Sequence, residues 1–146
     1  MAQTGSRNDA FRNFNFLVEI DGIAQASFTE CSGLESSTEV IDTREGGDNT
    51  TVRKLPGKTT YSDITLKWGM TSSDEVWKWR LSIIEGNIER KHGSIVVFDL
   101  ANKKEVARWN FENAWPSKWT GPTFNAKGNE VAIETLVLAH EGIRRA

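Results

Sequence analysis

The chain has 146 residues, of which 38% are hydrophobic, and its 18 Lys and Arg against 20 Asp and Glu give a formal charge of -2. This length predicts one domain, residues 1–146, that can bury a core without disulfides or metal ions. The balanced charge disfavours specific nucleic acid binding, because few cations are left to neutralise phosphates. The apolar runs are far shorter than the roughly 20 residues that span a bilayer, so we expect a soluble protein that is synthesised and folded in the cytoplasm.

Alternation of apolar and polar residues predicts strands in the first part of the chain. Residues 1–13 are polar and are expected to form an arm. Phe14 to Ile20 alternates with a period of two, and Asp21-Gly22 then supplies a hairpin-type turn. Further strands are predicted for residues 23–29 and 36–43.

A polar run follows, from Arg44 to Thr51, and its glycines and asparagine are typical of a loop. Pro56-Gly57 predicts a second turn. The alternation of Ile64, Leu66 and Trp68 then predicts the next strand.

One helix is predicted, over residues 73–85. Ser72 and Glu75 have the spacing of a capping box, and Gly86 fits the position after the C-cap. The apolar residues of the helix fall into two neighbouring stripes, so the helix should cover a wide apolar surface. We expect Trp77, in one of these stripes, to point into the core.

The rest of the chain again predicts strands, over residues 94–100, 105–111, 115–124 and 131–138. Trp109 is expected to lie on the core side of its strand. The pattern therefore predicts a mainly β fold of two packed antiparallel sheets, as a sandwich or barrel, with one covering helix.

The chain is rich in large aromatic residues, with six Trp and seven Phe against one Tyr. One interpretation is a core built from a few large side chains. The other is that some of these residues anchor contacts with other subunits, where aromatic side chains are enriched.

The residues that could carry chemistry do not form a recognisable site. Gly57-Lys58-Thr59 lacks the glycine that a phosphate loop needs five residues earlier, since Val52 stands there. His92 and His140 are the only histidines and do not have the spacing of a zinc site. Cys31 has no motif around it and is typical of a small buried thiol. We therefore expect no enzyme activity, no cofactor and no metal.

A series of short strings, taken together and in order, gives the sequence its specific character. These strings are Phe14–Gly22, Phe28–Leu34, Arg44–Gly47, Lys54–Lys58, Trp77–Arg80, Trp109–Pro116 and His140–Gly142. The set resembles the tail tube proteins of contractile-tail phages, and most closely the inner tube subunits of phage-tail-like contractile injection systems. The resemblance covers residues 11–142.

This resemblance implies an Hcp-like fold whose protomers form hexameric rings, and these rings stack into a hollow tube inside a contractile sheath. The implied partners are further copies of the chain, the sheath protein, baseplate or hub and tube-terminating proteins, and a protein cargo in the lumen. The implied work is mechanical: the tube carries cargo through a target membrane. The mature location would be an extracellular or membrane-attached injection particle, or a virion.

The resemblance also implies that residues 43–60 are an extended loop between subunits. The residues expected to make these contacts are Glu45, Gly46, Gly47, Asp48, Asn49, Thr50, Lys54, Leu55, Pro56, Gly57 and Lys58.

The lumen of such a tube should be polar, because a wall that bound its cargo tightly would slow release. In residues 131–138, alternation places Val131, Ile133 and Val137 toward the core and leaves Ala132, Glu134 and Leu136 on the other face. In residues 105–111 the corresponding polar side chains are Arg108 and Asn110. Glu134 and Arg108 are therefore the residues expected to face the lumen.

Two other functions remain open. An Hcp-type tube component of a type VI secretion system would share the fold and differ in the strings given above. A free β-sandwich binding module would instead show a pocket lined by tryptophans and would stay monomeric.

Overall fold

The computed structural model describes residues 14–23, 28–44, 46, 51–101, 103–128 and 131–146, so the predicted arm at 1–13 lies outside the described residues. The elements in chain order are β1 (Phe14–Ile20), β2 (Phe28–Ser32), β3 (Ser36–Thr43), β4 (Arg53–Tyr61), β5 (Ile64–Gly69), α1 (Glu75–Ile84), β6 (Lys91–Asp99), β7 (Glu105–Thr120), β8 (Ile133–Ala139) and β9 (Gly142–Arg145). The prediction of a mainly β chain with one helix is confirmed. Among the described residues, no helix has the length and hydropathy to cross a membrane.

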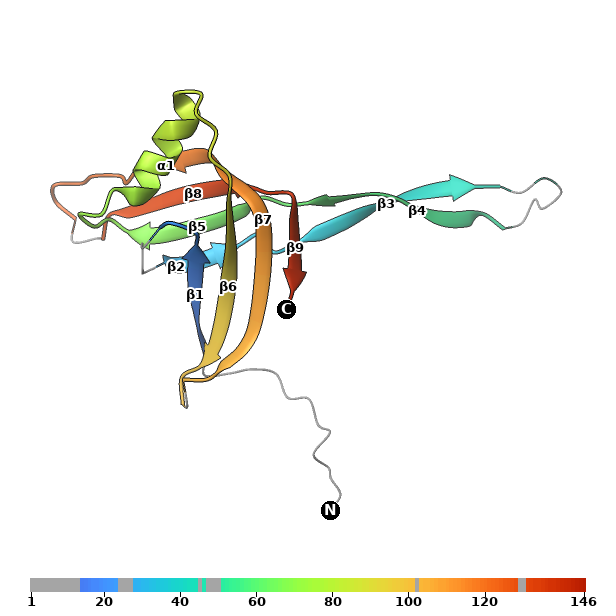
Figure 1. The fold of residues 1–146 in the computed structure, drawn as a ribbon, viewed down its shortest axis with the longest axis horizontal. Coiled ribbons are helices and arrows are strands. Elements are labelled where there is room, and N and C mark those ends of the chain that lie inside the picture. Colours follow the sequence, from blue (N-terminus) through green and yellow to red (C-terminus); the bar gives the residue numbers. More distant parts are fainter. Residues whose placement is uncertain (1–13, 24–27, 45, 47–50, 102, 129–130) are drawn as a thin grey trace, which may run out of the picture.

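The body of the molecule consists of two antiparallel layers that share the long strand β7. The strands follow the order β1-β6-β7-β8-β5-β2, with β9 also beside β7. The first part of β7 pairs with β6 and β9, whereas its last part, from Trp115 to Thr120, pairs with β8. Figure 1 shows β6 and β7 running across the direction of β5 and β8. The predicted pair of packed antiparallel sheets is confirmed.

Strand β7 is continuous where the sequence predicts two strands, 105–111 and 115–124, with Pro116 as a break. Pro116 lies inside β7, opposite Leu138, and the register shifts between Pro116 and Lys118. A bulge is a place where a strand tolerates the missing N–H of proline. Pro116 therefore coincides with the bulge in β7 and does not end the strand.

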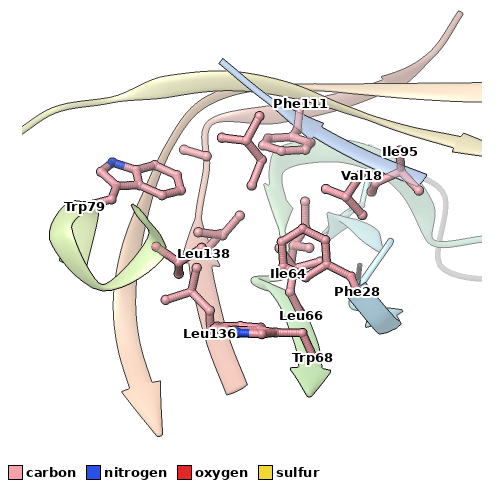
Figure 2. Packing of buried hydrophobic residues seen from close by; sticks show 13 residues of the cluster. Val18, Phe28, Ile64, Leu66, Trp68, Trp79, Ile95, Phe111, Leu136 and Leu138 are labelled. Atoms are coloured by element: carbon pink, nitrogen blue, oxygen red, sulfur yellow. The ribbon is translucent and has the colours of Figure 1, made fainter. Parts of the chain in front are cut away.

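The core lies between the two layers and is built largely from β5 and β8 (Figure 2). Leu66, Leu136 and Leu138 are completely buried, and the ring of Trp68 meets the edge of Phe28 with 5.6 Å between ring centroids. Across from them lie Val18, Ile95 and Phe111, on β1, β6 and β7. This apolar filling positions the strands and the helix of the body, to which the hairpin of β3 and β4 is attached.

The predicted orientation of residues 131–138 is wrong. Val131 is 71% exposed and Ile133 is also exposed, whereas Leu136 and Leu138 fill the core. Leu136 lies opposite Leu66 of β5, so the neighbouring strand fixes which face of β8 is buried. Glu134 is two residues from Leu136 and shares its face, which removes the reason for placing Glu134 on the opposite side.

Helix α1 uses only one of its two predicted apolar stripes. Val76 and Trp79 are buried, each 2% exposed, whereas Trp77 is 39% exposed and leans on Trp119 at 4.8 Å between ring centroids. The prediction that Trp77 points into the core is wrong. The indole Nε1 of Trp79 donates a hydrogen bond of 2.7 Å to the carbonyl of Glu89.

The structure tests three further predictions, two for the ends of α1 and one for Trp109. The predicted capping box at Ser72 is absent: the N-cap is Asp74, which makes no side-chain capping bond. Gly86 is confirmed after the C-cap, with φ of 85°. Trp109, expected on the core side, is only half-buried and lies outside the core cluster that contains Phe111; the guanidinium of Arg145 lies 5.3 Å from its ring.

The second predicted strand, 23–29, is displaced along the chain, because β2 begins at Phe28 and residues 24–27 lie outside the described residues. Strand β9 was not predicted. It is a short strand of four residues that ends in two arginines, so it offers little alternation to detect.

Candidate assembly surface

Strands β3 and β4 form a hairpin that projects away from the body (Figure 1). They pair only with each other, from Ser36 opposite Tyr61 to Thr43 opposite Arg53. The predicted turn at Pro56-Gly57 is therefore wrong, because both residues lie inside β4. Each strand of a two-stranded sheet has a free edge, where proline is tolerated. Of the predicted extended loop at 43–60, residues 53–60 form a strand.

Apolar side chains are exposed on both faces of this hairpin. Ile41 lies opposite Leu55 on one face, and Val40 lies opposite Pro56 on the other. Val40 is 61% exposed, and Ile41 and Leu55 are also exposed. A two-stranded hairpin without a core is marginally stable in water, so this one needs support from its root or from another molecule.

The root of the hairpin is tied to the body by hydrogen bonds. The Ser62 backbone N–H donates to the carbonyl of Glu35 at 3.1 Å, and the Ser62 hydroxyl oxygen lies 3.0 Å from the Glu35 carboxylate. His140 Nε2, at the end of β8, donates to the carbonyl of Ser62 at 2.8 Å. The Tyr61 ring lies 5.9 Å from the imidazole of His140. These contacts fix the direction in which the hairpin leaves the sheet.

The structure brings together part of the predicted set of contact residues. Lys54, Leu55, Pro56 and Lys58 are exposed along β4, and Gly57 is half-buried. A Cβ atom at Gly57 would lie 2.9 Å from Ile41 Cδ1, so glycine lets Ile41 lie across the hairpin. The remaining predicted residues are Gly46, which is exposed, and Glu45, Gly47, Asp48, Asn49 and Thr50, which lie outside the described residues.

The residues that sequence analysis missed are Val40 and Ile41. Val40 and Ile41 are adjacent in an otherwise polar strand, so their side chains lie on opposite faces. Neither face is therefore apolar enough to give an amphipathic pattern. Two adjacent aliphatic residues between Glu39 and Asp42 are the signal that could have identified an exposed apolar element.

The two predicted lumen residues lie on different layers. Arg108 Nη2 is 2.9 Å from a carboxylate oxygen of Glu105, and Arg108 Nη1 is 3.4 Å from Glu19. The hydrogen bond from Arg108 lowers the pKa of Glu105 below its ordinary value. Glu134 instead accepts a hydrogen bond of 3.3 Å from Trp119 Nε1 and is half-buried. The structure does not bring Arg108 and Glu134 into one cluster.

Among the described residues, no group of three or more His, Cys, Asp or Glu side chains is placed to hold a metal ion. A cleft of about 250 Å³ lies beside α1, lined by residues such as Glu75, Glu89 and Lys91. Trp79 is the one tryptophan among its lining residues, and Lys91 Nζ lies 5.8 Å from that ring. The cleft is therefore mostly charged and differs from the tryptophan-lined pocket expected of a binding module.

Burial raises the pKa of the Cys31 thiol to about 11. We expect native Cys31 to react with iodoacetamide at pH 8 at least about tenfold more slowly than the unfolded chain, because the thiolate is the reactive form. Mass spectrometry of timed reactions with and without denaturant measures the ratio. Equal rates would show that Cys31 is accessible and ionised in the folded protein.

Comparison with known proteins places this surface in context. Residues 12–144 match the family described as T4-like virus tail tube protein gp19. No curated protein matches the chain by sequence.

Solved structures match the fold over nearly the whole chain. One is from the sheath and tube terminator of an extracellular contractile injection system, PVC, in the extended state: it is 28% identical, covers 95% of this chain and 98% of that chain, and has a TM-score of 0.83. The sheath-tube complex of the same system gives 28% identity, coverage of 90% and 87%, and a TM-score of 0.78. Hcp1 from Flavobacterium johnsoniae, at 18% identity, coverage of 88% and 94% and a TM-score of 0.54, shares the fold alone.

Proposed function

The chain belongs to the T4-like virus tail tube protein gp19 family, and we propose that it is the inner tube subunit of a contractile injection system or contractile phage tail. In this role identical copies form hexameric rings, and the rings stack into a hollow tube that delivers cargo through a target membrane. The observation that carries this proposal is the projecting hairpin, whose apolar residues are exposed on both faces.

Open sheet edges supply a second means of association. Among the described strands, β1 and β2 end the main sheet path and β9 pairs only with β7. An exposed edge is a template for pairing with another chain, so neighbouring copies can satisfy these edges by adding strands. Six copies carry a formal charge of 6 × -2 = -12, which is small enough that screening at physiological salt does not prevent stacking.

The residues proposed to contact neighbouring subunits are those of the 43–60 segment given above, now extended by Val40 and Ile41. The strand part of this segment supports the proposal because it is exposed and yet held in a fixed direction by its root. Residues 1–13 are proposed to act as an arm outside the folded body.

We also propose a polar lumen wall. Arg108 is supported by its position among Glu19 and Glu105 on the outward face of its layer. Glu134 has less support, because its carboxylate is already engaged by Trp119 on the core side of β8. The outward face of the other layer carries Lys67 and Thr135, which lie opposite each other. The outward face of each layer therefore carries polar residues, as a polar lumen wall requires.

The proposed partners are the sheath protein, the baseplate or hub and tube-terminating proteins, together with a protein cargo. The match to a sheath-tube complex supports the sheath as a partner. Assembly would follow synthesis in the cytoplasm, and the finished tube would lie in an extracellular or membrane-attached particle or in a virion. We propose that the role of the chain is structural and not catalytic, in line with its match to a tail tube family.

The alternative function, an Hcp-type tube component of a type VI secretion system, is compatible with the fold of this chain. The sequence identity with Hcp1 is only 18%, so this similarity concerns the fold alone. The match to the tail tube family, in contrast, covers residues 12–144, which include both the body and the hairpin. The tail tube role is therefore the function that the chain supports best.

Electron microscopy of the purified chain tests this function. We expect negative-stain images to show six-fold rings and stacked tubes, from the chain alone or after adding a tube-initiating partner, because the exposed hairpin and sheet edges need cover. Sedimentation velocity measures the mass of the assembled species. A compact monomer at high concentration, with no tubes in native particles, would contradict the proposal.

A further inference from the structure

A second group of exposed apolar side chains lies at one end of the layer that contains β5 and β8. We define the end patch as Met70, Phe124, Val131 and Ile133, of which Val131 is 71% and Phe124 is 75% exposed. Ile133 pairs with Gly69 at the end of β5, and the Met70 N–H donates to the carbonyl of Ala132 at 2.8 Å. A Cβ atom at Gly69 would lie 3.4 Å from Val131 Cγ1, so Met70, Val131 and Ile133 are close neighbours, and Phe124 lies in the loop that leads from β7 toward them.

The end patch and the hairpin lie at opposite ends of the same strands. Strand β4 leads into β5 at Ile64, while Met70 follows the last residue of β5. Six residues of strand span about 20 Å. Figure 1 shows the hairpin pointing away from the body on one side and the loop between β7 and β8, which carries Phe124, on the other. The hairpin therefore cannot cover the end patch of its own chain.

We propose that the end patch is the docking surface for the β3–β4 hairpin of a second copy of this chain. The inference deepens the proposed function and rests on it. The hairpin brings Val40, Ile41 and Leu55, which are aliphatic and exposed, to a patch that is itself aliphatic and aromatic. One contact covers both surfaces.

The chemistry of the hairpin favours a neutral partner surface. Asp42 and Lys54 lie opposite each other and form an ion pair of 3.2 Å, and the two acids of β3 against the three bases of β4 leave the hairpin strands with a charge of only +1. A partner surface with charges of a single sign would not complement the hairpin. The apolar end patch complements the exposed aliphatic residues of the hairpin.

The geometry makes the contact head-to-tail. Two different surfaces of the same chain meet, so every added copy presents a new free hairpin and a new free end patch. Such a contact closes into a ring where the rotation between copies permits, and otherwise continues as a stack. This arrangement explains why both apolar surfaces occur on one small chain.

The test uses matched aspartate substitutions in the full chain. Val131→Asp in the end patch and Val40→Asp in the hairpin should each reduce the tube fraction pelleted by ultracentrifugation by at least about tenfold, because either one places a charge in an apolar contact. Ile88→Asp is the control, since Ile88 is 57% exposed and belongs to neither surface. Circular dichroism should show all three variants folded.

Cross-linking identifies the occupant of the patch directly. In a Cys31→Ala background, a chain with Val40→Cys and Val131→Cys should give ladders of linked copies when assembled tubes react with a short bismaleimide. The matched chain with Val40→Cys and Ile88→Cys should give only unlinked chains.

The outcomes separate this inference from the function on which it rests. Failure of the wild-type chain to form rings or tubes in any condition would overturn the proposed function. Wild-type tubes, together with normal tubes from Val131→Asp or no ladder from the Val40–Val131 pair, would overturn only the docking inference. Loss of stacking with intact rings and loss of the rings themselves both support it: the first places the contact between rings and the second within a ring.

Discussion

Replacing Trp79 with alanine is expected to lower the free energy of unfolding by about 3–5 kcal/mol. Trp79 is 2% exposed, and its Nε1 hydrogen bond to the Glu89 carbonyl holds the segment after α1 against the helix. The substitution removes the main buried side chain by which α1 is anchored and leaves that carbonyl without its donor. Urea unfolding followed by far-ultraviolet circular dichroism measures the change. Such a loss is a large part of the stability of a domain of this size.

Two variants separate the parts of this effect. Trp77→Ala, on the same helix, should cost about 1 kcal/mol, because Trp77 is 39% exposed and loses chiefly its contact with Trp119. Trp79→Phe should fall between the two, since it keeps most of the apolar volume and loses the hydrogen bond to Glu89. Equal costs for Trp77→Ala and Trp79→Ala would contradict the assignment of the buried stripe.

Strict alternation made some elements predictable to the residue. Phe14–Ile20 has one apolar face and one polar face, and the structure places the strand at those bounds. The strand Ser36–Thr43 was also predicted at its observed bounds. In the first, the period of two is visible in the sequence itself, and in the second the β-branched residues Thr38, Val40 and Ile41 favour a strand, so no knowledge of the neighbouring strands was needed.

Elements with apolar residues on both faces could not be oriented from the sequence. Residues 131–138 contain valine and isoleucine on one face and leucine on the other, and only pairing with Leu66 and Ile64 selects the leucine face. The helix presented the same difficulty, because Trp77 and Trp79 belong to adjacent stripes and contact with the sheet decides between them. Tertiary packing supplies the missing information in each case.

Part of the proposed assembly surface could be predicted from the sequence. The resemblance identified the segment from 43 to 60, but Pro56-Gly57 was interpreted as a turn, since these residues are the usual markers of one. The free edge of a two-stranded hairpin tolerates both residues within a strand. The end patch had no sequence signal, because Met70 and Val131 are far apart in the chain and meet only through the pairing of β5 with β8.

Removing the outer part of the hairpin should abolish tubes and leave the protomer folded. Thr38 and Thr59 are paired, with 2.9 Å between their hydroxyl oxygens, so Asn-Gly in place of residues 39–58 closes the two strands with a two-residue turn. The root contacts of Ser62 and His140 are untouched. We expect the free energy of unfolding to change by no more than about 1 kcal/mol, because the described strand residues among those deleted are mostly exposed and pair as β3 with β4.

A smaller deletion, of residues 46–51, tests the segment between β3 and β4 and leaves both strands in place. Both deletions are expected to lose tubes in negative-stain images, since the predicted contact residues include the tip and β4. Thermal unfolding by circular dichroism measures the protomer, and sedimentation velocity measures assembly. Unfolding of the 39–58 variant would make the hairpin part of the protomer's own stability, because its exposed apolar residues would then be acting within one chain. Normal tubes from that variant would instead leave the open edges of β1, β2 and β9 as the contacts that hold copies together.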